Sequence, residues 1–351
     1  MTSVAARALV TIAAIAFAAA SVRAQEMTGR VAVEAVVSAS TTSEAADDPF
    51  LMFDLVSTVR LGGGWDAVFR PWARRMPGGD WGTELYQAQI RYTSSTRVPF
   101  RVDAGIIPSP LGLATLELKA DRNPTIDAPF YYFVPLPPFD GHFDGVTLMS
   151  GGYPLGVVVT TSGERWDARG GVTDDTPARP RDVLHEPGTS HGPQLIAGGG
   201  ITPVAGLRLG AGFARGRYRA AADAAPALNA TVFNLEGEYA IGYTKISGEW
   251  IVDRFETTTI APAVARGFNL EALRTLTPRW FAAGRLVRAS SPVLAGPLPG
   301  RRSAASAEAT IGYRLTPQLT LRAGYQTSTR FGRPDWDHTA AASLVWAQRW
   351  W

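Results

Sequence analysis

The chain has 351 residues with no cysteine, and 34 basic against 31 acidic side chains give a formal net charge of +3. This composition excludes a disulfide framework and makes nucleic acid an unexpected partner. Hydrophobic residues make up 46% of the chain. They alternate with polar residues instead of forming blocks, so no stretch after the N-terminus is long enough for a transmembrane helix.

The N-terminus has the three parts of a secretory signal peptide. Arg7 supplies a positive charge, residues 8–20 form a thirteen-residue apolar core, and Val22-Arg23-Ala24 provides small residues around a cleavage point. The sequence therefore predicts a signal peptide over 1–24, removed on export, and a mature domain over 25–351. An N-terminal membrane anchor is the alternative.

The rest of the chain repeats one unit of about 10–13 residues in which apolar and polar residues alternate. A period of two is typical of β-strands with one apolar face. The predicted strands are 29–38, 50–61, 65–74, 83–93, 98–107, 144–161, 165–174, 193–202, 206–219, 229–241, 243–254, 264–276, 279–290, 304–315, 319–330 and 338–350.

Short junctions alternate with long ones between these strands. Thr202-Pro203, Thr277-Pro278 and Thr316-Pro317 mark tight turns, and longer segments rich in Ala, Asp, Pro, Ser and Gly lie between them. This is the pattern of an outer-membrane barrel, with turns toward the periplasm and loops outward. A turn at 151–154 would split strand 144–161 and break this sidedness. We therefore expect sixteen strands, with fourteen or eighteen as alternatives.

The two faces of the strands differ in a way that separates a membrane barrel from a soluble sandwich. In strand 304–315, Ala309, Ile311 and Tyr313 alternate with Glu308 and Thr310. A sandwich core would not carry charges on every second position of nearly every strand. The sequence therefore predicts an all-β, transmembrane antiparallel barrel with lipid outside and water inside.

The polar face carries many charges of both signs, with bases slightly ahead. Such charges are costly in a packed core but not in a hydrated lumen. Ion pairs that only hold the wall in shape are the alternative role for each of them. The residues predicted to line a pore are Arg60, Arg70, Arg91, Arg101, Asp103, Arg165, Asp167, Arg169, Glu249, Arg285 and Arg322.

The connection 108–143, after the fifth strand, is the longest in the chain. Its apolar and aromatic run at 129–135 is unsuited to a loop washed by solvent, so we expect the segment to fold into the barrel and narrow it. A hydrophobic cap over the mouth is the alternative. The residues expected at the constriction are Lys119, Asp121, Arg122, Asp127, Tyr131 and Tyr132.

Strand 206–219 changes character along its apolar face. Leu207, Leu209, Ala211 and Phe213 are followed in the same register by the arginines Arg215, Arg217 and Arg219. Four alternating apolar residues match the height of the lipid band, so the arginines should lie above it, near the phosphates of outer-leaflet glycolipid. A solvated loop base is the alternative.

No catalytic or metal-binding arrangement emerges from the sequence. The four histidines, His142, His185, His191 and His338, fall in predicted loops or at strand ends. Only His338 lies beside a serine, Ser328, on a neighbouring strand, which is a weak basis for a lipase-like dyad. We expect no enzyme activity, no metal and no cofactor.

Three segments carry a resemblance to a known family. "RVDAGIIPSPLG" (101–112), "GHFDGVTLMSGG" (141–152) and "RWDARGGVTDD" (165–175) resemble the phosphate-selective porins around their constriction loop. The resemblance implies a sixteen-stranded channel, often trimeric, with a loop folded inward. The phosphate-binding members use a lysine cluster, whereas this chain has only Lys119 and Lys245, so the likeness extends to a porin and not to its phosphate preference.

These features predict an outer-membrane porin for passive diffusion of small hydrophilic solutes or anions, and the resemblance to that family implies a homotrimer. A closed barrel with a structural or adhesin role is the alternative. The final strand ends in Trp350 and Trp351. A final strand that ends in an aromatic residue resembles the signal read by the barrel-assembly machinery. Arg349 departs from that pattern. The register of Leu344, Trp346 and Trp350 is expected to face lipid.

Overall fold

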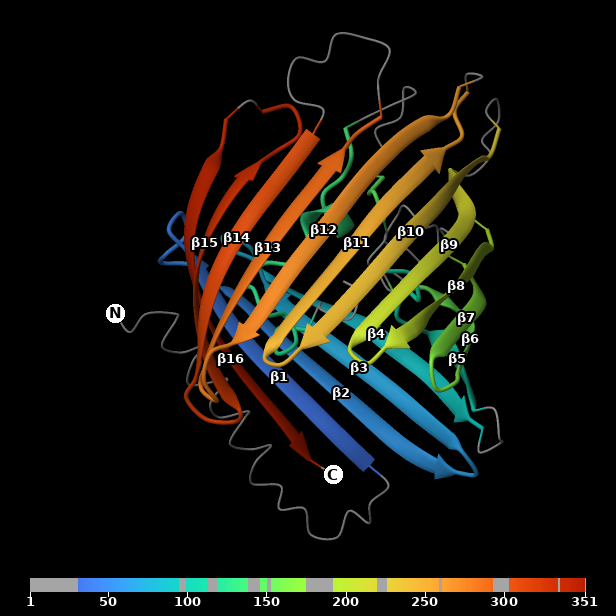
Figure 1. The fold of residues 1–351 in the computed structure, drawn as a ribbon, viewed down its shortest axis with the longest axis horizontal. Coiled ribbons are helices and arrows are strands. Elements are labelled where there is room, and N and C mark those ends of the chain that lie inside the picture. Colours follow the sequence, from blue (N-terminus) through green and yellow to red (C-terminus); the bar gives the residue numbers. More distant parts are fainter. Residues whose placement is uncertain are drawn as a thin grey trace.

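The computed structural model describes residues 31–94, 99–112, 119–137, 146–149, 153–174, 192–219, 226–258, 261–292, 303–333 and 335–350. Within these ranges the chain forms sixteen antiparallel strands that close into a barrel (Figure 1). The strands are β1 (Val31–Thr42), β2 (Phe50–Gly62), β3 (Trp65–Arg75), β4 (Trp81–Thr93), β5 (Phe100–Ile106), β6 (Leu155–Ser162), β7 (Trp166–Thr173), β8 (Gln194–Val204), β9 (Leu207–Arg219), β10 (Leu228–Ile241), β11 (Thr244–Phe255), β12 (Ala263–Thr275), β13 (Trp280–Ser290), β14 (Ser303–Arg314), β15 (Leu319–Thr329) and β16 (Asp337–Trp350).

Pairing of the first and last strands closes the barrel. Ten residue pairs join β1 to β16, from Val33 opposite Trp350 to Thr42 opposite Ala341. Every other strand pairs with its neighbours in sequence. Closure satisfies backbone donors and acceptors that an open sheet would leave at its edges, which a strand assembly in lipid requires. The predicted all-β class, closed barrel and strand number are confirmed.

One strand prediction was wrong. The sixth strand was expected over 144–161, but β6 spans only Leu155–Ser162. Val146, Leu148 and Met149 precede it outside any strand and are all buried. Thr147 between them is buried as well, so the segment has no exposed face and packs inside the molecule instead of extending the wall. The strand count remains sixteen because the segment before the break is not a strand.

The connections differ in length at the two ends of the barrel, as expected. Two short junctions use the threonine before proline to close the turn: the Thr277 hydroxyl accepts from Trp280 N at 3.0 Å, and the Thr316 hydroxyl accepts from Leu319 N at 3.0 Å. Between β8 and β9 the turn falls later, at Gly206, whose φ of 84° favours glycine and where a Cβ would collide with Ala240 O. The long connections lie at the opposite end (Figure 1).

The outward face is apolar over most of its height. Its exposed side chains include Leu209, Phe233, Leu235 and Ile311, which the alternation placed on this face. At the short-turn end, aromatic residues begin three strands and are exposed: Trp65, Trp166 and Trp280. An apolar band edged by aromatic side chains is the surface expected of a barrel in a bilayer. No helix among the described residues is long and apolar enough to cross a membrane.

The barrel interior holds described parts of the connection between β5 and β6, which runs over 107–154. Leu111, Tyr131, Tyr132, Leu148 and Met149 from this connection form one buried apolar cluster with inward-facing side chains of the wall. The wall residues of the cluster come from β8 to β13: Ile196, Ala214, Tyr218, Leu228, Ala230, Val232, Ile251, Phe255, Ala265, Val287 and Ala289. The connection therefore fills space beside one half of the wall.

Candidate functional site

On β4 and β5, near the short-turn end, two arginines share one carboxylate. Asp103 accepts from Arg91 Nε at 2.7 Å and lies 2.7 Å from Arg101 Nε. Gln89 also donates to it, at 2.6 Å. The Arg101 side chain is 46% exposed, whereas that of Asp103 is 7% exposed. The group therefore presents a net positive charge to the lumen.

A second ion-pair network joins β7, β9 and β10. Arg208 contacts Asp167 at 2.9 Å and Glu236 at 2.7 Å, and Arg169 contacts the same Glu236 at 3.3 Å. These pairs connect strands that are not all neighbours, so they brace the wall in addition to charging it. Arg165, predicted as the first residue of strand 165–174, instead lies exposed in the turn before β7.

Arg70 on β3 belongs to a buried polar group. It donates to both carboxylate oxygens of Asp54 and to the Tyr153 hydroxyl at 2.6 Å. Its guanidinium also lies 5.1 Å from the ring centre of Tyr86. Because Tyr153 directly precedes β6, this group ties the end of the long connection to the wall. Arg60, the remaining predicted residue on this side, is exposed at the short-turn end of β2.

Side chains of β13, β14 and β15 hold residues 123–127 of the connection by their backbone. Arg322 donates to Thr125 O at 2.8 Å and to Asn123 O, and Arg285 donates to Asp127 O. Glu308 accepts from Ile126 N at 2.7 Å. Backbone contacts of this kind fix the path of the segment whatever its side chains.

The start of this segment is held by β1. Lys119 Nζ lies 3.0 Å from Glu34, which also pairs with Arg349 at 2.9 Å. Burial raises the pKa of the Asp121 carboxyl, and the nearby negative charge of Glu34 raises it further. Among the described residues, no ion pair or side-chain hydrogen bond involves the guanidinium of Arg122, which is exposed.

The aromatic run is anchored to Glu249 on β11. The hydroxyls of Tyr131 and Tyr132, in a short 3₁₀ turn (η2, Phe130–Tyr132), donate to Glu249 Oε2 at 3.1 and 2.8 Å. Both rings are at most 1% exposed. Of the residues predicted for the constriction, Lys119, Asp127, Tyr131 and Tyr132 therefore contact the inner wall, whereas Arg122 is exposed. Whether the segment narrows a channel stays a prediction.

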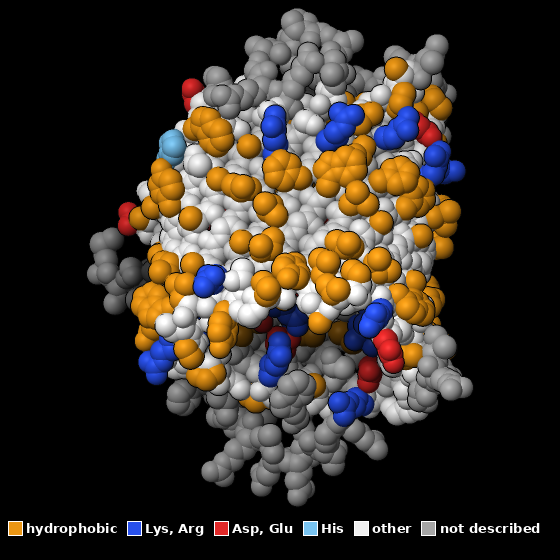
Figure 2. Space-filling model, viewed as in Figure 1, with side chains coloured by type: hydrophobic (Ala, Val, Ile, Leu, Met, Phe, Trp, Pro, Cys, Tyr) orange, Lys and Arg blue, Asp and Glu red, His pale blue; other side chains and the backbone are white. Residues whose placement is uncertain are grey.

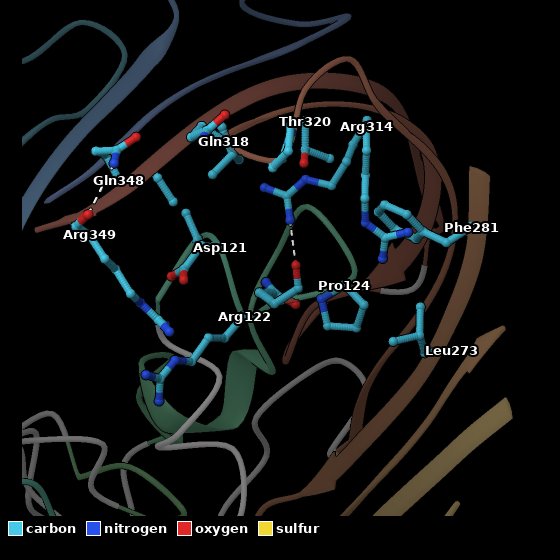
Figure 3. Close-up of a pocket in the computed structure, with 16 residues that line it drawn as sticks. Asp121, Arg122, Pro124, Leu273, Phe281, Arg314, Gln318, Thr320, Gln348 and Arg349 are labelled. Atoms are coloured by element: carbon cyan, nitrogen blue, oxygen red, sulfur yellow. Dashed lines mark hydrogen bonds between the residues drawn. The ribbon is translucent and has the colours of Figure 1, made fainter. Parts of the chain in front are cut away.

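A cavity of about 500 Å³ lies at the short-turn end, between residues 120–124 of the connection and β12–β16. Figure 3 shows Arg122 and Arg349 on one side of it and Arg314 against Phe281 on the other. A smaller cavity, of about 180 Å³, lies on the other side of residues 126–127, toward the long connections.

The outward face carries a basic row that the sequence indicated only in part. Arg215 and Arg217 on β9 are exposed, as are Arg254, Arg266 and Arg288 on β11, β12 and β13. We call these five residues the arginine row. Figure 2 shows basic side chains along the upper edge of the apolar band, in the part of the view that β9–β13 occupy in Figure 1. Arg219 ends β9 and is half-buried.

No protein-family model and no curated protein matches the sequence. Solved structures do match over nearly the whole chain. The anion-selective porin of Comamonas acidovorans aligns with a TM-score of 0.57 at 14% identity, over 91% of this chain and 99% of that one. OprB of Pseudomonas putida aligns with 0.58 at 10%, over 92% and 93%. OmpT of Vibrio cholerae in its trimer form aligns with 0.53 at 10%, over 91% and 98%. The chain has the porin fold.

The porin fold and the apolar outer band together place the chain in the bacterial outer membrane, as predicted. At 10–14% identity the likeness extends to the fold alone, so it does not test the phosphate preference of the family that the sequence resembles. His338 gives no sign of the weakly indicated dyad: its Nδ1 lies 2.9 Å from the Tyr325 hydroxyl, and it is Asp337, not His338, that pairs with Ser328 across β15 and β16.

Several residues that position the porin-fold interior were not singled out as site residues from the sequence. Glu34 and Tyr153 each bind a predicted site residue, and Glu308 binds the backbone of Ile126 and of the predicted residue Asp127. The polar parity marked Glu34 and Glu308 as inward, but nothing local indicated their partners, which are 85 and 182 positions away in the chain. Tyr153 was assigned to a strand and was therefore missed.

Proposed function

We propose that this protein is a porin for passive diffusion of small hydrophilic solutes with a preference for anions. The observation that carries the proposal is a sixteen-stranded barrel with an apolar exterior and an inner wall of charged side chains. Barrels of this size enclose an aqueous channel, and the charges on its wall select among solutes. The exposed Arg101 and Arg122 are the described luminal charges that favour anions most directly.

The segment 119–137 acts as the constriction in this proposal. It lies against the inner wall on β1 and β11–β15, and its buried cluster reaches β8–β10, so it leaves the permeation route between itself and β2–β7. Arg122 on the segment, and Arg91 and Arg101 with Asp103 on that wall, then contribute to the field that a permeating ion meets.

Replacing Arg101 by alanine should shift the reversal potential in a salt gradient toward cation preference. The substitution removes one of two positive charges around Asp103, which then balances Arg91 alone. Asp103→Asn should shift it in the opposite direction by a comparable amount. The measurement is the reversal potential of each purified variant in planar bilayers.

Arg279→Ala is the matched control, because Arg279 lies in an exposed short turn and donates to Tyr313 without contacting these groups. Its reversal potential should equal that of the unaltered protein. Unchanged potentials for both Arg101→Ala and Asp103→Asn would mean that these charges serve the wall alone.

The arginine row supports a second part of the proposal, binding of outer-leaflet glycolipid. Its members lie at the ends of β9 and β11–β13 nearest the long connections, on the face turned to lipid. Long loops face outward in outer-membrane barrels, so the row lies at the height of the glycolipid phosphates. Among the described residues, only Arg215 of the row has an acidic partner, Glu256 at 2.8 Å. A guanidinium group can donate two parallel hydrogen bonds to the oxygens of one phosphate.

The triple substitution of Arg215, Arg254 and Arg266 by glutamine should weaken glycolipid binding by at least tenfold, since each charge-assisted hydrogen bond contributes about 1.5–3 kcal/mol. Arg274→Gln is the control, because Arg274 is exposed on the same strand as Arg266 but at the short-turn edge. The measurement is retention of purified glycolipid in detergent by native mass spectrometry. Equal loss in the control would contradict the proposal.

Two further partners are proposed on lesser grounds. A homotrimer is supported by the trimer form of the structurally similar OmpT of Vibrio cholerae. Recognition by the barrel-assembly machinery is supported by the aromatic end of β16, where Trp346 and Trp350 lie 6.2 Å apart between ring centres. Leu344 on this strand is exposed, while Arg349 pairs with Glu34, so the even register carries the outward face as expected.

A further inference from the structure

The cavity at the short-turn end has an unusual charge composition. Four arginines and one aspartate line it: Arg122, Arg314, Arg322, Arg349 and Asp121. Arg349 is neutralised by Glu34. Among the described residues, no ion pair joins any of the other three arginines to a carboxylate, so the cavity has an excess of positive charge.

The arginines are held in place by neutral groups. Arg322 is 6% exposed and donates from Nε to the Ser343 hydroxyl at 2.9 Å and from Nη1 to two backbone carbonyls. Arg314 donates to Pro278 O at 3.2 Å. These contacts orient the guanidinium groups but do not balance their charge. The carboxylates of Glu308 and Asp121 act on Arg322 without forming an ion pair with it, so its charge is balanced only in part, which is costly for a buried cation. A bound anion would supply the missing charge.

The rest of the lining is mixed: Asn123, Gln318, Thr320 and Gln348 are polar, and one part of the wall is apolar. Leu273, Phe281, Val345 and Pro124 contribute to the cavity, and the Arg314 guanidinium lies 5.0 Å from the ring centre of Phe281. A volume of about 500 Å³ is ample for a small organic molecule. Cationic forks next to an apolar wall match a molecule that has a carboxylate at one end and an apolar body at the other.

We infer that this cavity binds a small organic anion, a carboxylate joined to an apolar or aromatic body, through Arg122, Arg314 and Arg322. The ligand would lie between the connection and the wall, on the periplasmic side of the residues held by Glu308 and Arg285. A role of this ligand in transport depends on the proposed porin function, whereas binding of the ligand to the cavity does not.

The experiment titrates the full mature chain, folded in detergent, with sodium benzoate in a calorimeter at constant ionic strength. One saturable site per chain is expected. Benzyl alcohol, which keeps the ring but lacks the charge, should bind at least tenfold more weakly, and sodium chloride should give no saturable heat. Equally tight binding of benzyl alcohol would overturn the assignment to arginines.

Two variants locate the site. Arg314→Gln and Arg122→Gln should each weaken benzoate binding roughly tenfold or more, the loss expected for one charge-assisted contact. The guanidinium of Arg122 forms no ion pair or side-chain hydrogen bond with the described residues, so its replacement should leave folding unchanged. Arg314→Lys should restore part of the affinity. Arg279→Gln removes a charge from a nearby turn outside the cavity and should bind as the unaltered chain does.

Absence of saturable benzoate binding, or binding unaffected by both glutamine variants, would overturn the inference. Conductance measured on the same preparation separates this outcome from failure of the proposed function. A protein that binds benzoate but conducts no current would support the inference and contradict the proposed function. A protein that conducts but does not bind benzoate would contradict the inference and leave the proposed function unaffected.

Discussion

Replacing Leu235 by arginine is expected to destabilise the folded barrel in a bilayer by about 2–4 kcal/mol. Leu235 lies in the middle of β10, is 55% exposed and pairs with Ala211 and Trp250 on its neighbours. Its outward direction places the new charge in the hydrocarbon region, where no water can solvate it. The measurement is reversible urea unfolding from lipid vesicles.

Tyr243→Arg is the matched control. Tyr243 lies in the short turn after the same strand and is 80% exposed, beyond the apolar band. The cost there should be only about 0–1 kcal/mol, as for charges near the interface. A cost at Leu235 no larger than that at Tyr243 would mean that the apolar face does not meet lipid.

Deleting residues 119–137 is expected to raise single-channel conductance several-fold. The segment lies against the inner wall, so its removal returns that space to water. The wall groups that it contacts, Arg285, Glu308 and Arg322, would then be hydrated instead of buried, which limits the loss of stability. The measurement is conductance in a planar bilayer at fixed salt.

A second variant addresses the segment without shortening it. Glu308→Ala removes the acceptor for Ile126 N at 2.7 Å and for Asp127 N at 3.4 Å. Weaker anchoring should appear as excess current noise between open levels. An unchanged conductance after the deletion, in protein shown to be folded, would place the segment outside the permeation route.

The fold was predictable because lipid imposes one rule on every strand. An outward side chain has no polar partner, so the alternation at Ile311 and Glu308, or at Leu235 and Glu236, survives wherever the chain crosses the band. The same rule revealed Arg215 and Arg217, where the alternation continues but the chemistry changes. It missed Arg254, Arg266 and Arg288 because single arginines at strand ends resemble ordinary loop bases.

The interior was less predictable because its contacts join residues distant in the chain. Periodicity indicates that Arg322 faces inward, but not that it binds the backbone at Asn123 and Thr125, nearly 200 positions earlier. Alternation also fails inside the barrel. The segment 146–149 has no face turned to lipid or water. Its apolar residues were therefore predicted as part of a strand, although they pack inside the barrel as part of the connection.

The central claim, that this closed wall surrounds a water-filled path, is tested most directly by single-channel recording of purified residues 25–351 in a planar bilayer. The account predicts discrete, lasting current steps, with a reversal potential in a salt gradient displaced toward anions. A current indistinguishable from that of the bare bilayer, from protein shown by its circular dichroism and heat-dependent gel mobility to be a folded barrel, would contradict it.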